Sequence, residues 1–204
     1  MKKNKKFIYL ISPPIIKKNI FFKNLNLVLK TKKISHFQLR LKKKKFKELI
    51  LIGKKIKKIC RKNNVKLIIN DQPLAANKIG ADGCHLGQDD GSIKKARKIL
   101  KNKIIGVTCH NSIKLVKKAL KEGADYIAIG AFYSTKTKKI KYKASVNLLL
   151  KAKKITKKPI VVIGGINSIN YKKLLLNKAN FLAISGYVWN NKKLNPEEAI
   201  KKIK

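Results

Sequence analysis

Carboxylates are scarce in this chain, which has nine Asp and Glu residues against 52 Lys and Arg residues and a formal net charge of +43. Arginine is scarce as well, because Arg40, Arg61 and Arg97 are its only representatives. The lysines are spread along the whole chain and are not interleaved with the aromatic side chains on which nucleic-acid bases stack. We therefore expect a solvated lysine surface with no specific nucleic-acid partner, together with salt-sensitive adhesion to polyanions.

Cysteines and long apolar runs are also limited. Cys60, Cys84 and Cys109 form no C-x-x-C pair and are odd in number, which is typical of a protein in a reducing cytoplasm. The apolar run near the N-terminus is broken by Ser12 and two prolines. No apolar run reaches the roughly 18 residues that a membrane span needs. We expect a cytoplasmic protein that does not contact membranes.

Short apolar runs recur along the chain, and most are followed by a polar break and an amphipathic, lysine-rich segment. Eight strands alternating with helices predict an α/β protein, a (β/α)8 TIM barrel that forms a single domain over residues 1–204. A doubly wound open sheet is the alternative, but no G-x-G-x-x-G follows the first run. The expected strands are Phe7–Ile11, Ile34–Leu39, Lys66–Ile69, Gly83–Leu86, Ile104–Val107, Tyr126–Ile129, Ile160–Ile163 and Phe181–Ile184. The clearest helices are Phe46–Asn63, Ile113–Glu122 and Val146–Ile155, and a last helix begins at Pro196.

Polar side chains directly follow almost every predicted strand. Because the carboxyl ends of barrel strands share one rim, where active sites lie, we expect these residues to form one site. The residues are Gln38, Arg40, Lys42, Asn70, Asp71, Gln88, Asp89, Asp90, Thr108, His110, Thr135, Thr137, Lys138, Gly164, Gly165, Ser185 and Gly186.

Four of the nine carboxylates fall between residues 71 and 90. We expect Asp71 and Asp90 to bind Mg²⁺, because magnesium takes one or two carboxylates together with substrate phosphates. Helix capping by the same two residues is the alternative. Asp82 stands in a Gly-Ala-Asp turn and is expected to be structural, and Asp89 is expected to point away if Asp90 points in.

Phosphate-binding groups surround this cluster in the predicted barrel. Polar and apolar residues alternate over residues 38–42, which places Gln38, Arg40 and Lys42 on one face of an extended segment. Arginine offers a planar fork and lysine a point charge to a phosphoryl group. Residues 135–138 form a loop of hydroxyls and amines, and the glycines at 164–165 allow backbone N–H groups to approach a phosphate.

Several motifs, in order along the chain, resemble the thiamine phosphate synthase family. They are Gln-x-Arg-x-Lys, Leu-Ile-Ile-Asn-Asp, Gly-Ala-Asp-Gly-x-His-Leu-Gly-Gln-Asp-Asp, Ile-Gly-Val-Thr-x-His, Thr-x-Thr-Lys and Ile-Gly-Gly-Ile. The resemblance runs from about Tyr9 to Trp189 and is most specific over residues 66–90. It implies a (β/α)8 barrel that joins a hydroxymethylpyrimidine diphosphate to a hydroxyethylthiazole phosphate, forming thiamine phosphate and releasing pyrophosphate.

The resemblance also implies a role for each matching residue. Asp71 and Asp90 would hold Mg²⁺ on the diphosphate, and Thr108 would lie near the pyrimidine. Arg40, Lys138 and Thr108 would be the catalytic residues. The diphosphate would be bound by Gln38, Arg40, Lys42, Asn70 and Lys138, within a segment that includes Leu39 and Leu41. The thiazole phosphate would be bound by Thr135, Lys136, Thr137, Gly165, Ile184 and Ser185.

The chain departs from the family pattern mainly in the thiazole-phosphate half. Thr108 replaces a serine but keeps the hydroxyl, and the other departures lie at 130–131, 178–180 and 185–187. Three alternatives stay open: a sister-family thiazole tautomerase that uses His110, a non-catalytic barrel that binds polyanions or nucleic acids, and a paralogue that binds thiazole phosphate without turnover. The expected partners are small-molecule substrates, and a homo-oligomer is left open.

Overall fold

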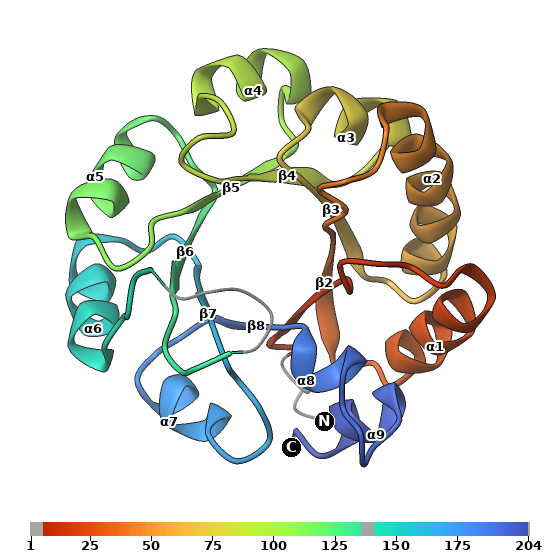
Figure 1. Ribbon diagram of the computed structural model, residues 1–204. Helices are drawn as coiled ribbons and strands as arrows, with labels where there is room; N and C mark the ends of the chain where they lie inside the picture. Colours follow the sequence, from red (N-terminus) through yellow and green to blue (C-terminus); the bar gives the residue numbers. More distant parts are fainter. Residues whose placement is uncertain (1–5, 136–140, 204) are drawn as a thin grey trace.

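The structure is a computed structural model that describes residues 6–135 and 141–203. Eight parallel strands close into a barrel in chain order, and helices surround it (Figure 1). The predicted TIM barrel is confirmed, and the open-sheet alternative is wrong. The strands are β1 (Ile8–Ile11), β2 (Ile34–Leu39), β3 (Lys66–Asn70), β4 (Gly83–Leu86), β5 (Ile104–Thr108), β6 (Tyr126–Gly130), β7 (Ile160–Ile163) and β8 (Phe181–Ile184).

Each strand is followed by a helix, and β8 is followed by two. The helices are α1 (Lys18–Lys30), α2 (Phe46–Lys62), α3 (Pro73–Ile79), α4 (Ile93–Leu100), α5 (Ile113–Lys121), α6 (Val146–Ile155), α7 (Tyr171–Leu176), α8 (Gly186–Trp189) and α9 (Pro196–Lys201). The four helices expected from the sequence are confirmed to within a residue where bounds were predicted. Within the described residues, no helix is long and apolar enough to cross a membrane.

Helix α2 shows how a lysine-rich sequence still forms this fold. Leu49, Ile52, Ile56 and Cys60 recur at helical spacing and are buried against the barrel. Most lysines of α2 lie on the other faces of the helix and are exposed, while one stripe is apolar. Because each outer helix needs only such a stripe, a lysine coat is compatible with a complete core.

Three matching side chains anchor the amino-terminal ends of odd-numbered strands. Each directly precedes an even-numbered strand and accepts a hydrogen bond from an N–H at the start of the strand before it. We call these three side chains the strand-start acceptors. They are Asp82 with Leu67 N at 2.7 Å, Asp125 with Ile105 N at 2.8 Å, and Asn180 with Ile160 N at 2.9 Å.

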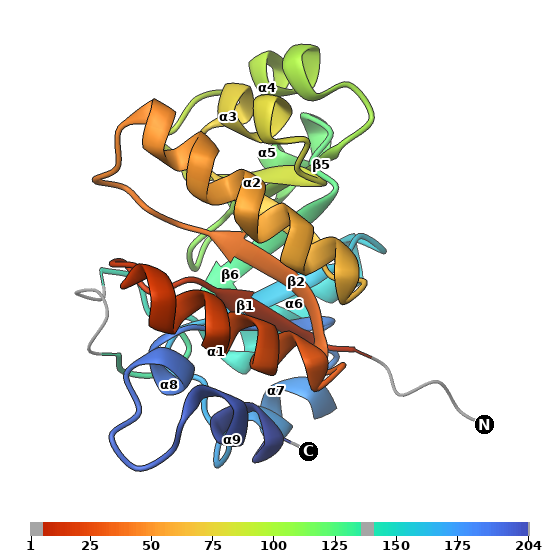
Figure 2. The same cartoon turned by 90° about the vertical axis from the view of Figure 1, so that its right-hand side faces the viewer.

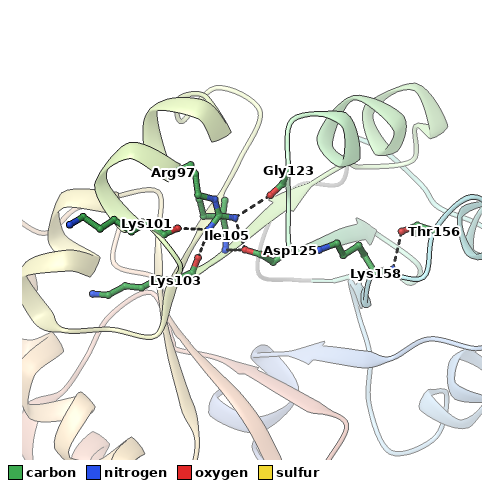
Figure 3. A network of polar contacts seen from close by, with 8 residues as sticks. All are labelled: Arg97, Lys101, Lys103, Ile105, Gly123, Asp125, Thr156 and Lys158. Carbon is green, nitrogen blue, oxygen red and sulfur yellow. Dashed lines mark hydrogen bonds and ion pairs between the residues drawn. The ribbon is translucent and has the colours of Figure 1, made fainter.

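Each strand-start acceptor also binds a cation from the helix that precedes the anchored strand. The pairs are Asp82 with Lys57 at 2.7 Å, Asp125 with Arg97 at 2.7 Å, and Asn180 with Lys153 at 3.0 Å. The Arg97 pair is the most extensive, because its guanidinium also donates to the carbonyls of Lys101, Lys103 and Gly123 (Figure 3). Asp82 is therefore structural, as predicted, and Asn180 supplies the same kind of acceptor without a charge.

Lys33 holds the corresponding position before β2, and it anchors the carboxyl-terminal segment instead. Its Nζ donates to Lys201 O at 3.2 Å and to Ile203 O at 2.8 Å. Helix α9 packs against α1 and α8 on the same side of the barrel (Figure 2). Asn195 and Glu198 form a reciprocal capping box at the start of α9, and these two hydrogen bonds fix the residue at which the helix begins.

His36 is a half-buried histidine inside the barrel. Its ring stacks on Tyr9 and meets Phe181 edge-on, and its Nδ1 lies 3.0 Å from Ser35 Oγ. Burial lowers the pKa of His36 from 6.5 to about 4, with Lys66 acting in the same direction and Asp82 opposing. Folded His36 therefore stays neutral at pH values where the unfolded chain takes up a proton.

The neutral His36 ring predicts a loss of stability in acid. Its contribution is complete above about pH 6.5 and is lost as the pH falls toward 4, because the unfolded state then binds more protons. When the pH is lowered from 7 to 5, we expect the unfolding free energy of the wild type to fall by about 2 kcal/mol more than that of His36→Phe. Urea unfolding at the two pH values measures the difference, and equal losses in the two proteins would contradict the prediction.

Candidate active site

A cavity of about 430 Å³ opens at the carboxyl ends of β2, β3 and β4. Five of its lining residues were predicted from the sequence to bind the metal or the diphosphate, so these are brought together. The lining comprises Leu41, Lys42, Leu49, Asn70, Asp71, Gln72, Asp89 and Asp90. Asp89 is exposed and also lines the cavity, and the direction of its side chain stays a prediction.

Asp71 and Asp90 are placed by the backbone around them. Asp71 has a φ of 63°, and its N–H donates to His85 O at 2.8 Å, which continues the pairing of β3 with β4 beyond the strand. The Asp90 Oδ2 accepts a hydrogen bond from Gly87 N at 3.2 Å. A Cβ at Gly87 would overlap this carboxylate, so glycine is needed for the close approach.

The two carboxylates are close enough to affect each other. Burial, then the hydrogen bond and charge of Asp90, raise the pKa of Asp71 to about 6. Lys42 opposes this shift, and its Nζ lies 3.4 Å from Asp71 Oδ2. A partly buried carboxylate pair of this kind favours a bound cation, which is here supplied by a lysine.

Neither aspartate caps a helix, so the capping alternative is wrong for both. Helix α3 has Gln72 at its N-cap position and Pro73 in its first turn. Helix α4 is capped by Ser92, whose side chain accepts a hydrogen bond from Lys95 N. The carboxylates of Asp71 and Asp90 are consequently available for another ligand.

The segment that follows β2 is held by Ser12 at the end of β1. Arg40 N donates to Ser12 Oγ at 2.9 Å, and Ser12 Oγ donates to Arg40 O at 3.3 Å. The charge of Arg40 also lowers the pKa of His85. Gln38 points into the barrel and is buried, whereas Leu39 packs into the core between strands and helices with no exposed surface.

Thr108 ends β5 and is bound to a buried histidine. Its Oγ1 lies 2.8 Å from His85 Nε2, and its carbonyl accepts a hydrogen bond from Gln88 Nε2. Burial lowers the pKa of His85 to about 4, with Asp90 opposing and Arg40 assisting. No role was predicted for His85 from the sequence, and its strand is buried on both faces, so the pattern gives no signal of which residues it would meet.

The described residues among those predicted to bind the thiazole phosphate lie at the end of β8 and on the loops after β6, β7 and β8. Gly165 has a φ of 60°, and a Cβ there would overlap the Ser134 carbonyl, so glycine allows the loops after β6 and β7 to touch. Ser185 Oγ donates to Ser12 O at 3.2 Å, and Ile184 is buried at the end of β8. Thr135 ends the first described segment, whereas Lys136, Thr137 and Lys138 lie outside the described residues.

His110 lies on the same rim but has a different environment. Its ring centroid is 4.4 Å from that of Tyr142, and its carbonyl accepts a hydrogen bond from Gly130 N at 3.0 Å. Over residues 6–135 and 141–203, no group of three or more His, Cys, Asp or Glu side chains has the arrangement of a complete metal site. A metal held by Asp71 and Asp90 would thus need oxygen ligands from a substrate or from water.

Comparison with known proteins identifies the family of this chain. The family model described as thiamine monophosphate synthase matches residues 8–188. A thiamine-phosphate synthase of Pelagibacter ubique is 67% identical over 201 residues, which cover 98% of this chain and 97% of the relative. Another from Rhodospirillum centenum is 36% identical over 185 residues, which cover 90% of this chain and 89% of the relative.

A solved structure has the same architecture. Thiamine phosphate pyrophosphorylase from Pyrococcus furiosus superposes with a TM-score of 0.86 at 26% sequence identity. The superposition covers 98% of this chain and 94% of that chain. The barrel and the order of its helices are therefore shared over nearly the whole length.

Proposed function

The chain belongs to the thiamine monophosphate synthase family, and from this membership we propose how its rim residues work. The protein is a transferase of thiamine biosynthesis that joins a hydroxymethylpyrimidine diphosphate to a hydroxyethylthiazole phosphate and releases pyrophosphate. The observation that supports our assignment of roles is the Asp71–Asp90 pair, which shares one cavity with Lys42 and Asn70. This cavity would receive the diphosphate.

The reaction is a substitution at the pyrimidine methylene. The bond from this carbon to the diphosphate oxygen breaks, and the thiazole nitrogen forms the new bond to carbon. Negative charge grows on the leaving diphosphate, so fixed cations beside it lower the barrier. We assign this role to Arg40 and Lys42, and we predict it for Lys138.

The donor set of the cavity fits Mg²⁺. Asp71, Asp90 and the Asn70 amide offer oxygen atoms, which are the ligands that magnesium prefers. When bound, the ion would neutralise diphosphate charge as a Lewis acid. The pKa of Asp71, raised to about 6 by burial and by Asp90, supports a pair that favours a cation. Lys42 Nζ lies 3.4 Å from Asp71 Oδ2, and it would be able to bind a phosphate oxygen if a metal took its place beside this carboxylate.

The remaining roles stay predictions. Gln38, Asn70 and Thr108 would orient the pyrimidine diphosphate, and Thr135, Gly165, Ile184 and Ser185, with Lys136 and Thr137, would hold the thiazole phosphate. No proton has to leave the reacting carbon or nitrogen, which agrees with a site built from positioning groups. A tautomerase that uses His110 and a polyanion-binding barrel are not favoured. The cytoplasmic location, the single-domain organisation and a homo-oligomer are likewise predictions.

A two-substrate assay tests the proposal. Purified protein with Mg²⁺ and both substrates should release pyrophosphate and form thiamine phosphate in equal amounts. Omitting the thiazole phosphate or chelating the metal should abolish formation of the product. Folded protein that shows no turnover with both substrates would contradict the function, and full activity with chelator present would contradict the metal assignment.

A further inference from the structure

A line of hydrogen bonds crosses the interior of the barrel. Tyr9 Oη from β1 lies 2.8 Å from Tyr126 Oη from β6. Tyr126 Oη lies 2.8 Å from His85 Nδ1, and His85 Nε2 lies 2.8 Å from Thr108 Oγ1. Gln38 is a further side-chain hydrogen-bond partner of Tyr9. We call this line the interior relay; it joins Gln38 and Thr108, two residues assigned to the pyrimidine diphosphate.

The relay is buried and its members are uncharged. Tyr9 and Tyr126 are both almost fully inaccessible to solvent, and burial raises the pKa of each phenol above its ordinary value. His85 is buried as well, and its two ring nitrogens contact two neutral hydroxyls, those of Tyr126 and Thr108, which favours a neutral imidazole. The His85 ring stacks on Tyr126 with centroids 5.6 Å apart, which holds both polar ends in place.

A neutral imidazole has one N–H group and one acceptor nitrogen. If His85 Nδ1 accepts from Tyr126, then Nε2 must donate to Thr108, and the reverse holds for the other tautomer. The orientation of the Thr108 hydroxyl is therefore decided at the opposite end of the relay. Tyr126 and His85 therefore control the orientation of the Thr108 hydroxyl without contacting the substrate themselves.

The acidities of the partners set the direction of the relay. A phenol, with an ordinary pKa near 10, is a stronger acid than the aliphatic hydroxyl of threonine and is the better donor to a basic nitrogen. Tyr126 then donates to His85 Nδ1, and His85 Nε2–H donates to Thr108 Oγ1. Upstream, Tyr9 donates to Tyr126 and the Gln38 amide N–H donates to Tyr9. The hydrogen of the Thr108 hydroxyl is left free to point into the site.

We propose that the interior relay presents the Thr108 hydroxyl as a hydrogen-bond donor to an acceptor atom of the pyrimidine diphosphate. Tyr126 and His85 are positioning residues, because they act through Thr108. The identity of the substrate rests on the proposed function, whereas the direction of the relay does not. A substrate that carries a donor in place of this acceptor would be disfavoured, so the relay contributes to specificity.

Nitrogen NMR on the ligand-free protein tests the direction directly. Long-range ¹H–¹⁵N correlation spectra should show His85 as the Nε2–H tautomer with an unprotonated Nδ1. Tyr126→Phe removes the donor to Nδ1 and should release both tautomers into exchange. An Nδ1–H tautomer in the wild type, or an unchanged His85 signal in Tyr126→Phe, would overturn the proposal whatever the enzyme's activity.

Kinetics test whether the relay acts on the substrate. Tyr126→Phe should lower kcat/KM for the pyrimidine diphosphate about tenfold, the value of one neutral hydrogen bond, and leave KM for the thiazole phosphate unchanged. Tyr171→Phe is the matched control, because it removes another buried phenol hydroxyl outside the relay and should leave both constants unchanged. Equal behaviour of the two variants in an active enzyme would overturn the proposal.

Two further comparisons separate positioning from folding. His85→Gln keeps a side-chain N–H near the Nε2 position and should retain more activity than His85→Leu. The double variant Thr108→Val with Tyr126→Phe should be no worse than Thr108→Val alone, since both changes remove one interaction. Additive losses would overturn the relay. Wild-type protein inactive with both substrates would instead refute the proposed function and leave the NMR result standing.

Discussion

Replacing Asp71 or Asp90 by alanine is expected to lower kcat about a thousandfold. Each carboxylate is assigned to a metal ion that would neutralise charge on the leaving diphosphate and so lower the barrier by several kcal/mol. Asp71→Asn and Asp90→Asn keep the shape of the side chains and should instead raise the Mg²⁺ concentration needed for half-maximal rate. Initial rates of pyrophosphate release, measured as a function of Mg²⁺, separate the two effects.

Glu197→Gln is the control for the metal prediction. Glu197 is paired with Lys201 at 2.7 Å on α9, outside the candidate site, so its loss removes one charge without touching the cavity. This variant should keep the wild-type dependence on Mg²⁺. The metal assignment would be refuted if Asp71→Ala and Asp90→Ala kept the same rate and the same Mg²⁺ dependence as the control.

Replacing Asp125 by alanine is expected to cost about 3 kcal/mol of unfolding free energy, equivalent to a fall in Tm of roughly 6–12 °C. The change leaves the N–H of Ile105 without its acceptor and Arg97 without its carboxylate partner (Figure 3). Arg97 keeps its three carbonyl acceptors, which limits the loss. Urea unfolding with a free fit of the m-value measures the effect.

Exchanging amide and carboxylate groups at two strand-start acceptors tests the same contacts by their charge. Asn180→Asp should gain up to about 1 kcal/mol, because the new charge lies beside Lys153, whose Nζ is 3.0 Å from Asn180 Oδ1. Asp125→Asn should lose only about 1 kcal/mol, since the acceptor for Ile105 is kept. If Asp125→Ala and Asp125→Asn were equally stable, the hydrogen bond to Ile105 N would not be the stabilising contact.

The barrel could be predicted because its signal repeats. Each run such as Ile160–Ile163 is apolar on both faces, as expected for a parallel strand buried between the barrel interior and the helices. The rim could be predicted for the same reason, since polar residues follow the runs at regular places. Asp71 and Asp90 were then conspicuous in a chain with nine acids.

Features that depend on three-dimensional contacts were not accessible from the sequence. The positive φ of Asp71 separates it from the helix start that its position suggested, and Ser92 rather than Asp90 caps α4. His85 lies in a strand whose two faces are both buried, so periodicity could not tell which neighbour it would meet. Its bonds to Tyr126 and Thr108 join residues 41 and 23 positions away along the chain.

The strand-start contacts also differ in how far they reach along the chain. Those of Asp82, Asp125 and Asn180 span 15, 20 and 20 residues, whereas the two bonds of Lys33 span 168 and 170. Closing a short loop costs less entropy than closing a long one. The contacts of the three acceptors can therefore form locally as the chain leaves the ribosome, while the two bonds of Lys33 form only once the residues up to 203 have been synthesised.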